Sequence, residues 1–290
     1  MSKNLEKLKK YISGSEEYMS SYAKTHMLNN DFTKIDTSLG SGAFIKSNRL
    51  RKIKYFFAYF LQILIWRNEM FFNEFIKKYQ NICTFQSRIM SYELIIHAIV
   101  LKLLNNKKIL KDKICVIGDG KANFINGLLD LNYVGKIYSI NLPQALTQDY
   151  LILRKFEHID DNLIQIVEKK EDLTNQNKKI FLVPASNKKL LESQNINLFV
   201  NMHSFQEMPL EETHKYVDII SSNYAYLYSL NREEKILYDN TIIKHEDFGF
   251  HKGKIIFEEE AKFAKYYYSS KFPFIHSKKA KLISTLIKFN

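Results

Sequence analysis

The chain has 290 residues, 46% of them hydrophobic and 14% aromatic, which is ample for a packed core, and its 9 glycines and 4 prolines argue against long disordered linkers. Lys and Arg number 43 against 31 Asp and Glu, a net charge of +12, but the lysines are dispersed apart from residues 261–290, which hold seven lysines and no acid. Dispersed charge argues against a nucleic-acid partner, although a basic nucleic-acid or membrane-surface binder remains an alternative.

The N-terminal region, residues 1–105, is predicted to be helical. Apolar residues recur at helical spacing within 4–12, 50–80 and 91–104, while glycines and serines mark 34–48 as a loop. We expect this region to act as a lid over a substrate or as a dimerisation surface, so a homodimer is an open alternative.

Residues 1–24 are polar and charged, so we expect no export signal there. The longest apolar run, 55–66, is shorter than the about 20 residues that span a bilayer. The two cysteines, Cys83 and Cys115, stand in apolar patterns, as buried thiols in a reducing compartment do. We therefore expect a cytoplasmic protein, with at most peripheral membrane contact through the basic segment 49–54.

The pattern changes at Lys111, after which strand-like runs alternate with helical ones. Predicted strands cover 114–117, 136–141, 180–183, 198–201 and 224–229, and predicted helices cover 122–131, 144–156, 187–193 and 210–222. Alternation with short connections implies right-handed crossovers and a mostly parallel sheet. In the tail, 241–244 and 254–257 predict an antiparallel hairpin at the sheet edge. The predicted fold class is α/β, with a Rossmann-like, mostly parallel, seven-stranded sheet in a domain at 106–290.

The first predicted strand runs into a glycine turn, Gly118-Asp119-Gly120. Glycine lets the chain turn sharply and lets a ligand approach the backbone, and the next helix should offer free amides. The third glycine of a dinucleotide fingerprint is absent. The turn therefore favours a nucleoside cofactor with little or no phosphate, such as S-adenosylmethionine, and a plain turn is the alternative.

The second predicted strand ends in Asn141, at the position where an acid usually holds the ribose hydroxyls of a nucleotide. Asparagine can still donate to and accept from a hydroxyl, but without charge. A turn asparagine before Leu142 and Pro143 is the alternative interpretation.

A polar cluster at 201–208 (NMHSFQEM) follows the fourth predicted strand, 198–201, and precedes a predicted helix. In open α/β sheets, such a strand end is the usual place for an active site. His203 can titrate near neutrality, so it is predicted to be a catalytic base. Glu207 is predicted to orient it or to bind substrate. Alternatively, Ser204 and Glu207 form a capping box for the helix that follows.

The histidines elsewhere favour structural roles. His245 and His251 stand with Glu246 and Asp247 in a second polar cluster, but three convergent ligands are needed for a metal, and none is expected. His97 stands in an apolar helix and is predicted to be a core residue.

These segments together resemble the sugar O-methyltransferases, S-adenosylmethionine-dependent enzymes of bacterial polysaccharide gene clusters. The resemblance covers about 90–235 and rests on four runs, namely 117–120, 141–151, the strongest at 201–208, and 228–231. It implies a class I methyltransferase fold and O-methylation of a sugar hydroxyl on a nucleotide sugar or surface-glycan precursor.

The resemblance also implies roles for individual residues. His203 and Glu207 would assist an in-line methyl transfer. The predicted cofactor residues are Gly118, Asp119, Gly120, Asn141, Leu142 and Asn201, and the predicted substrate residues are Ser204, Gln206, Tyr228 and Asn231.

Three positions depart from the methyltransferase pattern. Val116 and Asn141 stand where acids are usual, and Ala122 stands where a third glycine is usual. These departures keep a different class open, a non-catalytic binding protein that has the fold and has lost the cofactor.

Overall fold

The computed structural model describes residues 2–12, 15, 19, 21, 24–25, 49–156, 159–269 and 271–290, and within 49–55 only the helical backbone. The loop predicted at 34–48 lies outside the described residues.

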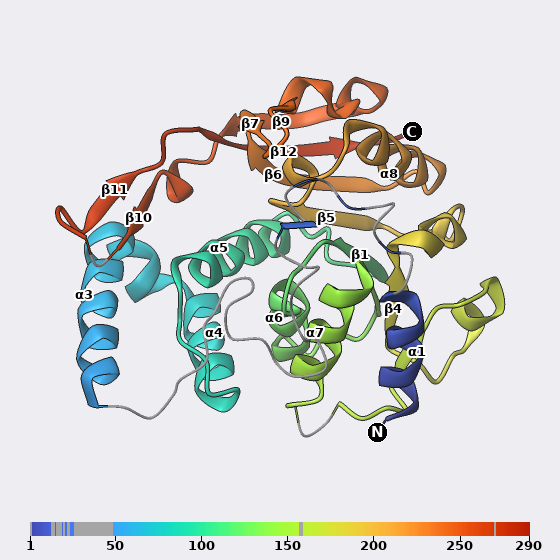
Figure 1. Cartoon of the computed structure of the whole chain (residues 1–290), viewed down its shortest axis with the longest axis horizontal. Helices are drawn as coiled ribbons and strands as arrows, with labels where there is room; N and C mark the ends of the chain where they lie inside the picture. Colours follow the sequence, from blue (N-terminus) through green and yellow to red (C-terminus); the bar gives the residue numbers. More distant parts are fainter. Residues whose placement is uncertain are drawn as a thin grey trace.

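An eight-stranded sheet forms the centre of the molecule (Figure 1). Its order is β3-β4-β2-β1-β5-β6-β12-β9, and β12 is antiparallel to both of its neighbours while the pairs from β3 to β6 are parallel. The strands are β1 (Lys113–Ile117), β2 (Lys136–Asn141), β3 (Ile164–Ile166), β4 (Ile180–Pro184), β5 (Leu198–Met202), β6 (Tyr226–Arg232), β9 (Lys254–Glu260) and β12 (Leu282–Lys288). The predicted Rossmann-like α/β class is confirmed, with one strand more than expected. The strands β3 and β12 were not predicted, and the strand predicted at 241–244 lies outside this sheet.

Successive side chains of each strand enter two separate cores. In β1, Ile114 and Val116 belong to one core, and Cys115 and Ile117 to the other. Helices α4 to α7 cover the first face, and α8 with short 3-10 helices covers the second (Figure 1). The helices are α4 (Glu74–Phe85), α5 (Tyr92–Asn106), α6 (Asn123–Asp130), α7 (Pro143–Leu153) and α8 (Leu210–Ser222). Burial on both faces explains why the central strands β1, β2, β4 and β5 are apolar without alternation.

The N-terminal helices pack on two different parts of this layer. Helix α1 (Lys3–Ile12) buries Leu5 and Leu8, and it contacts α7 and β3. Helices α4 and α5 instead pack on α6, so closely that a Cβ at Gly127 would lie 2.5 Å from Tyr79 Oη. The division at residue 105 stays a prediction.

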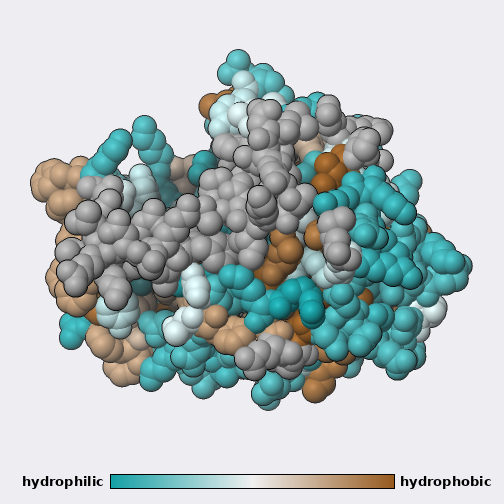
Figure 2. Space-filling model, turned by 60° about the horizontal axis from the view of Figure 1, so that its bottom comes forward, coloured by the Kyte–Doolittle hydropathy of each residue, from teal (hydrophilic) through white to brown (hydrophobic). Residues whose placement is uncertain are grey.

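Helix α3 (Arg49–Phe72) stands at one end of the molecule and is kinked at Trp66. It is joined to the rest by the hairpin of β10 (Tyr266–Tyr268) and β11 (Ile275–Ser277), where Gln62 Nε2 donates to Tyr268 Oη at 2.7 Å. Its outer side chains form what we call the aromatic face of α3: Phe56, Phe57, Tyr59, Phe60, Leu64, Phe71 and Phe72, all exposed. Figure 2 shows apolar surface at this end of the molecule. In the described part of the chain, no helix combines the length and the hydrophobicity needed to cross a membrane.

The predicted hairpin of 241–244 with 254–257 is wrong. β8 (Ile242–Lys244) pairs with β7 (Glu234–Ile236) in a separate ribbon. The second segment belongs to β9, which pairs with β12 in the main sheet. The apolar strand β12 offers a longer partner than the three-residue β8. Both cysteines are buried and free, as predicted.

Candidate functional site

A cavity of about 350 Å³ lies where the two predicted loops meet, at the carboxyl ends of β1 and β5. The loop Gly118–Gly120 and the loop after β5 form one side of it. Helix α5 supplies Tyr92, Glu93 and His97, so the cavity lies between the 201–208 loop and the N-terminal helices. We call it the inner cavity.

The two glycines of the turn are needed for different reasons. Both have positive φ, +70° at Gly118 and +55° at Gly120. A Cβ at Gly118 would lie 2.4 Å from Ser204 Cβ, so glycine allows the two loops to touch. A Cβ at Gly120 would meet nothing within 4 Å, so this glycine leaves backbone open to a ligand.

Asp119 closes the turn onto the following helix. Its carboxylate accepts hydrogen bonds from the amides of Phe124 at 2.7 Å and Ile125 at 3.0 Å. The prediction of free amides at this helix start is therefore wrong for these two. Burial, reinforced by Asp149, raises the pKa of Asp119 to about 8.

Asp149, on α7, bonds to the backbone just after the same turn. Its Oδ1 accepts a hydrogen bond from the Ala122 amide at 2.8 Å, and its Oδ2 accepts one from Ser139 at 3.4 Å. The side chain is fully buried, which raises its pKa to about 6. Sequence reasoning gave this residue no role, although an acid inside an apolar helix was a usable signal.

Asn141 and Leu142 lie beside the turn but do not line the inner cavity. Ile140 of β2 is level with Ile117 of β1, so Asn141 ends its strand next to Gly118. The Asn141 Oδ1 accepts a hydrogen bond from the Leu142 amide at 2.9 Å.

The polar residues after β5 are largely bonded to one another. Asn231 Nδ2 donates to Asn201 Oδ1 at 2.8 Å, and Asn201 Nδ2 donates to Ser204 Oγ. Ser204 Oγ donates to the Ile117 carbonyl at 3.0 Å. Gln206 Oε1 accepts a hydrogen bond from the backbone amide of Arg232 at 2.6 Å. Ser204 and Gln206 line the cavity, whereas Asn201 and Asn231 are fully buried behind them. The network fixes the shape of the loop.

Tyr228 is a core residue in this structure. It is fully buried, and its hydroxyl pairs with Ser284 Oγ at 3.0 Å on the neighbouring strand. It does not line the inner cavity.

His203 lies at the cavity wall in a left-handed conformation, φ +68°. Its pKa is lowered to about 3, mainly by burial and next by the charge of Lys278, with smaller contributions that include Arg232. The expectation that this residue titrates near neutrality is therefore wrong. The imidazole is neutral at physiological pH and only weakly basic.

Glu207 lines the same cavity, and its Oε1 accepts from Lys235 Nζ at 2.6 Å. Among the described residues, no hydrogen bond joins it to His203. The capping-box alternative is wrong, because Pro209 precedes α8 at the cap position and Ser204 Oγ bonds to the Ile117 carbonyl instead.

Two cations that sequence reasoning did not select also line the inner cavity, Arg232 at the end of β6 and Lys278 after β11. Lys278 Nζ lies 5.1 Å above the centroid of the Tyr92 ring. Burial lowers the pKa of Lys278 to about 8, and Arg232 adds to this shift. The excess of lysines in 261–290 was a usable sequence signal for Lys278, whereas Arg232 lies outside that segment.

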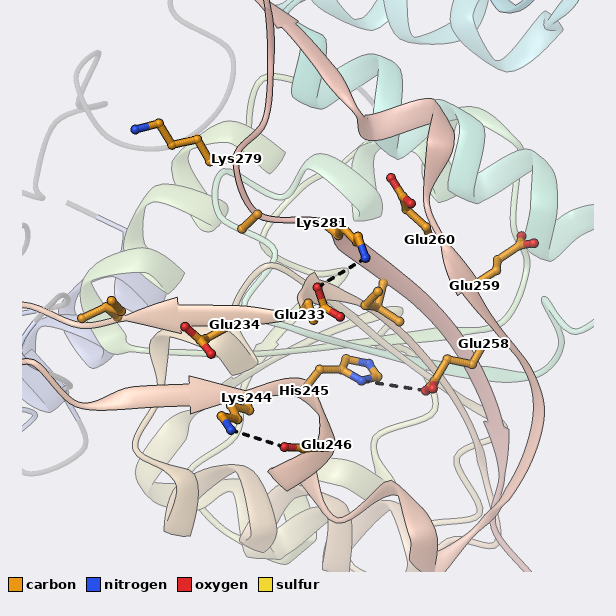
Figure 3. Close-up of a pocket in the computed structure, with 13 residues that line it drawn as sticks. Glu233, Glu234, Lys244, His245, Glu246, Glu258, Glu259, Glu260, Lys279 and Lys281 are labelled. Carbon is orange, nitrogen blue, oxygen red and sulfur yellow. Dashed lines mark ion pairs between the residues drawn. The ribbon is translucent and has the colours of Figure 1, made fainter.

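A larger cavity of about 930 Å³ lies on the far side of the 279–281 segment, between the β7–β8 ribbon and β9 (Figure 3). Its wall is rich in glutamates, of which Glu258 pairs with His245 Nδ1 at 3.8 Å (Figure 3). Neither the glycine turn nor His203 borders it. Across the described residues, no three His, Cys, Asp or Glu side chains gather as metal ligands would.

Comparison with models of known protein families gives no match, and neither does comparison with curated proteins. Solved structures with a similar course of the chain include a SAM-dependent methyltransferase from Anabaena variabilis, which is 10% identical with a TM-score of 0.46 over 74% of this chain and 93% of that one. Magnesium protoporphyrin IX methyltransferase from Synechocystis, solved with bound SAH, is 10% identical with a TM-score of 0.42 over 68% and 83%. A SAM-dependent methyltransferase from Aquifex aeolicus is 12% identical with a TM-score of 0.38 over 64% and 88%. The chemistry of this chain has to be judged from its own residues.

Proposed function

We propose that the protein is an S-adenosylmethionine-dependent O-methyltransferase of the cytoplasm that acts on a sugar hydroxyl of a nucleotide sugar or surface-glycan precursor. The observation that carries this proposal is the meeting of the glycine turn and the His203 loop around one cavity at the carboxyl edge of a doubly wound sheet. This is the edge at which such folds bind their ligands.

The turn fits the cofactor in one respect that the structure makes concrete, the backbone left open at Gly120. In this proposal the turn holds the amino acid part of the cofactor, and Asn141 and Leu142 hold its ribose. When bound, S-adenosylmethionine supplies an electrophilic methyl group.

The acceptor hydroxyl would lie against His203 and Glu207. Neutral His203 can accept a hydrogen bond from the hydroxyl and take its proton as the hydroxyl attacks. Glu207, held by Lys235, adds a carboxylate that can bind a second sugar hydroxyl. Ser204 and Gln206 keep this wall rigid through the network behind it.

A non-catalytic binding protein is the second candidate, and the low pKa of His203 favours it. Calorimetric titration with S-adenosylmethionine and S-adenosylhomocysteine separates the two, since a protein that has lost the cofactor binds neither.

The matched variants for this titration are Gly120→Val and Gly120→Ala. Both place a Cβ on a residue at positive φ, where the β-branched valine costs more than alanine, and the valine also fills the open side of the turn. We expect valine to abolish binding and alanine to weaken it less. Gly118 is unsuited to this test, because any Cβ there would displace Ser204. Equal affinity for valine and wild type would place the cofactor elsewhere.

For partners, the aromatic face of α3 supports a homodimer, with peripheral membrane contact as the other use of such a face.

A further inference from the structure

We propose that the acceptor carries an oxyanion, a phosphate or a carboxylate, and that Arg232 and Lys278 bind it at the outer end of the inner cavity. This deepens the proposed function by naming the charge of the substrate. It rests on that function only where it takes the bound oxyanion to be part of the methyl acceptor.

Both cations are without an ion pair among the described residues. Three acidic side chains line the inner cavity, and two of them are already engaged. Glu207 pairs with Lys235 at 2.6 Å. Asp119 bonds to two backbone amides of α6, and its pKa of about 8 keeps it protonated near neutrality. Glu93 favours the charged form of Lys278 without forming an ion pair with it. One carboxylate therefore faces two positive charges.

The cost of this arrangement falls on Lys278, which is partly buried, whereas Arg232 is exposed to solvent. Arg232 destabilises the charge on Lys278, and burial does so more strongly, bringing its pKa to about 8. Lys278 and Arg232 also disfavour protonation of His203 on the opposite wall. An oxyanion between the two cations would relieve each of these repulsions, and a guanidinium binds phosphate or carboxylate with two parallel hydrogen bonds.

The same two cations border a second cavity of about 860 Å³, which we call the outer cavity. Tyr92, Arg232 and Lys278 line both cavities, so the two adjoin at these side chains. The hairpin supplies the other wall, where the rings of Tyr267 and His276 stack with centroids 5.2 Å apart. Aromatic rings offer flat apolar surface to a sugar or a base, and the volume admits more than a monosaccharide. If the oxyanion lies between Arg232 and Lys278, where the two cavities adjoin, one sugar of the acceptor can lie against His203 in the inner cavity and the rest of the acceptor in the outer cavity.

Binding of simple probes tests the proposal without any methyl transfer. The probes are glucose 6-phosphate, glucuronate and glucose, titrated by calorimetry at low salt into the full chain. We expect at least one charged sugar to bind about tenfold or more tighter than glucose, the scale of a charge-assisted contact. The preferred charged sugar tells phosphate from carboxylate. Equal affinity for all three sugars, or no binding, would overturn the proposal.

The variants Arg232→Gln and Lys278→Gln should each reduce the affinity for the charged sugar about tenfold, while leaving that for glucose unchanged. Lys281→Gln is the matched control, because Lys281 faces Glu233 in the glutamate-rich cavity and loses the same charge. An equal loss in this control would mean that net charge, not the pair, attracts the ligand.

Lys278 also gives the site a pH signature. Its neighbours that titrate or carry charge are Tyr92 and Glu93 on α5, Arg232 on β6 and His203. Since Lys278 loses its proton around pH 8 in the free protein, affinity for the charged sugar should fall above pH 8. Lys278→Arg should keep that affinity to higher pH, and a fall that persists in this variant would contradict the assignment. If S-adenosylhomocysteine fails to bind while the charged sugar binds, the methyltransferase proposal fails and the oxyanion site stands.

Discussion

The pKa of His203, about 3, decides what this side chain can contribute at the residue scale. The imidazole stays neutral across the physiological range, so a ring nitrogen is always available to accept a hydrogen bond. Its weak basicity means that it can take a proton only from a hydroxyl that has become acidic, as an attacking sugar hydroxyl does late in the reaction.

His203→Ala should lower turnover about a hundredfold or more, the usual scale for a general base. Affinity for S-adenosylhomocysteine should barely change, because in the proposed function His203 contacts the acceptor and not the cofactor. The wild-type profile of turnover against pH should show no limb from His203 between pH 5 and 8, given its pKa of about 3. Steady-state assays and calorimetry measure these quantities. If Glu207→Gln loses turnover and His203→Ala keeps it, Glu207 is the base.

Asp119 should make the fold less stable as pH rises from 6.5 to 8. Its folded-state pKa of about 8 lies above the ordinary value of 3.8, so the folded protein keeps a proton that the unfolded chain has released, and stability is lost as pH rises through 8. Below pH 6.5, Asp149, with a pKa raised to about 6, adds to this trend, whereas His97 and His203, lowered to about 3, oppose it. Above pH 6.5 Asp119 contributes most of the slope, and Lys278, whose pKa is lowered to about 8, opposes it near the upper end of the window.

Asp119→Asn should remove this slope, which corresponds to about 1–2 kcal/mol across the window. Urea unfolding at several pH values measures it. Asp130→Asn is the control and should keep the slope. Asp130 lies at the C-terminal end of α6, the helix whose first amides bond to Asp119. A slope that survives Asp119→Asn would assign the proton to another group.

The location of the inner cavity was predictable from two sequence motifs, the glycine turn and the 201–208 loop. The charged residues around it were not, because they stand in no local sequence pattern. Gly118 and His203 follow buried strands, and that position is readable from hydropathy. The pairing of Glu207 with Lys235, and the approach of Lys278 to Arg232, join segments whose proximity depends on the whole fold. Periodicity carries no information about such contacts.

At the scale of elements, the same distinction holds. The strands at 136–141 and 180–184 and the helix at 210–222 were predictable, because each buries a continuous or periodic apolar surface. β9 was assigned the wrong partner, since its side chains are mostly exposed and its place depends on β12, which no periodic pattern singled out.

Gly127 is where α4, α5 and α6 approach one another most closely. A Cβ there would lie 2.5 Å from Tyr79 Oη and 2.8 Å from Leu101 Cδ2. Gly127→Ala should gain about 1 kcal/mol of helix propensity but lose about 1–3 kcal/mol through overpacking, so a net destabilisation is expected in urea unfolding. Adding Tyr79→Phe removes the nearest atom and should restore part of the loss. A stabilised single variant would show that the three helices are less tightly packed than described.

At the scale of the whole molecule, the aromatic face of α3 gathers seven exposed large apolar side chains on one helix. Phe56 and Phe72 are 76% and 82% exposed. We expect concentration-dependent self-association in sedimentation velocity, and the double variant Phe56→Ser, Phe72→Ser should remain monomeric. Val134→Ser is the control, because this exposed apolar residue lies on a loop of the sheet domain. A monomeric wild type at all concentrations would contradict the homodimer, and vesicle sedimentation would then test membrane contact.

The position of β12 inside the sheet has a consequence for biosynthesis. β6 ends at residue 232 and its partner β12 begins at residue 282, so about fifty residues must be translated between them, which takes about 3–10 s at the usual rate. Until then one edge of β6, the strand that carries Asn231 and Arg232, has no hydrogen-bonding partner. A nascent chain in this interval resembles an exposed edge strand and is open to pairing with another polypeptide. Frameshifts or premature stops before residue 288 should therefore send the product to chaperones and proteases, even though every residue of the glycine turn and of the His203 loop has already been made.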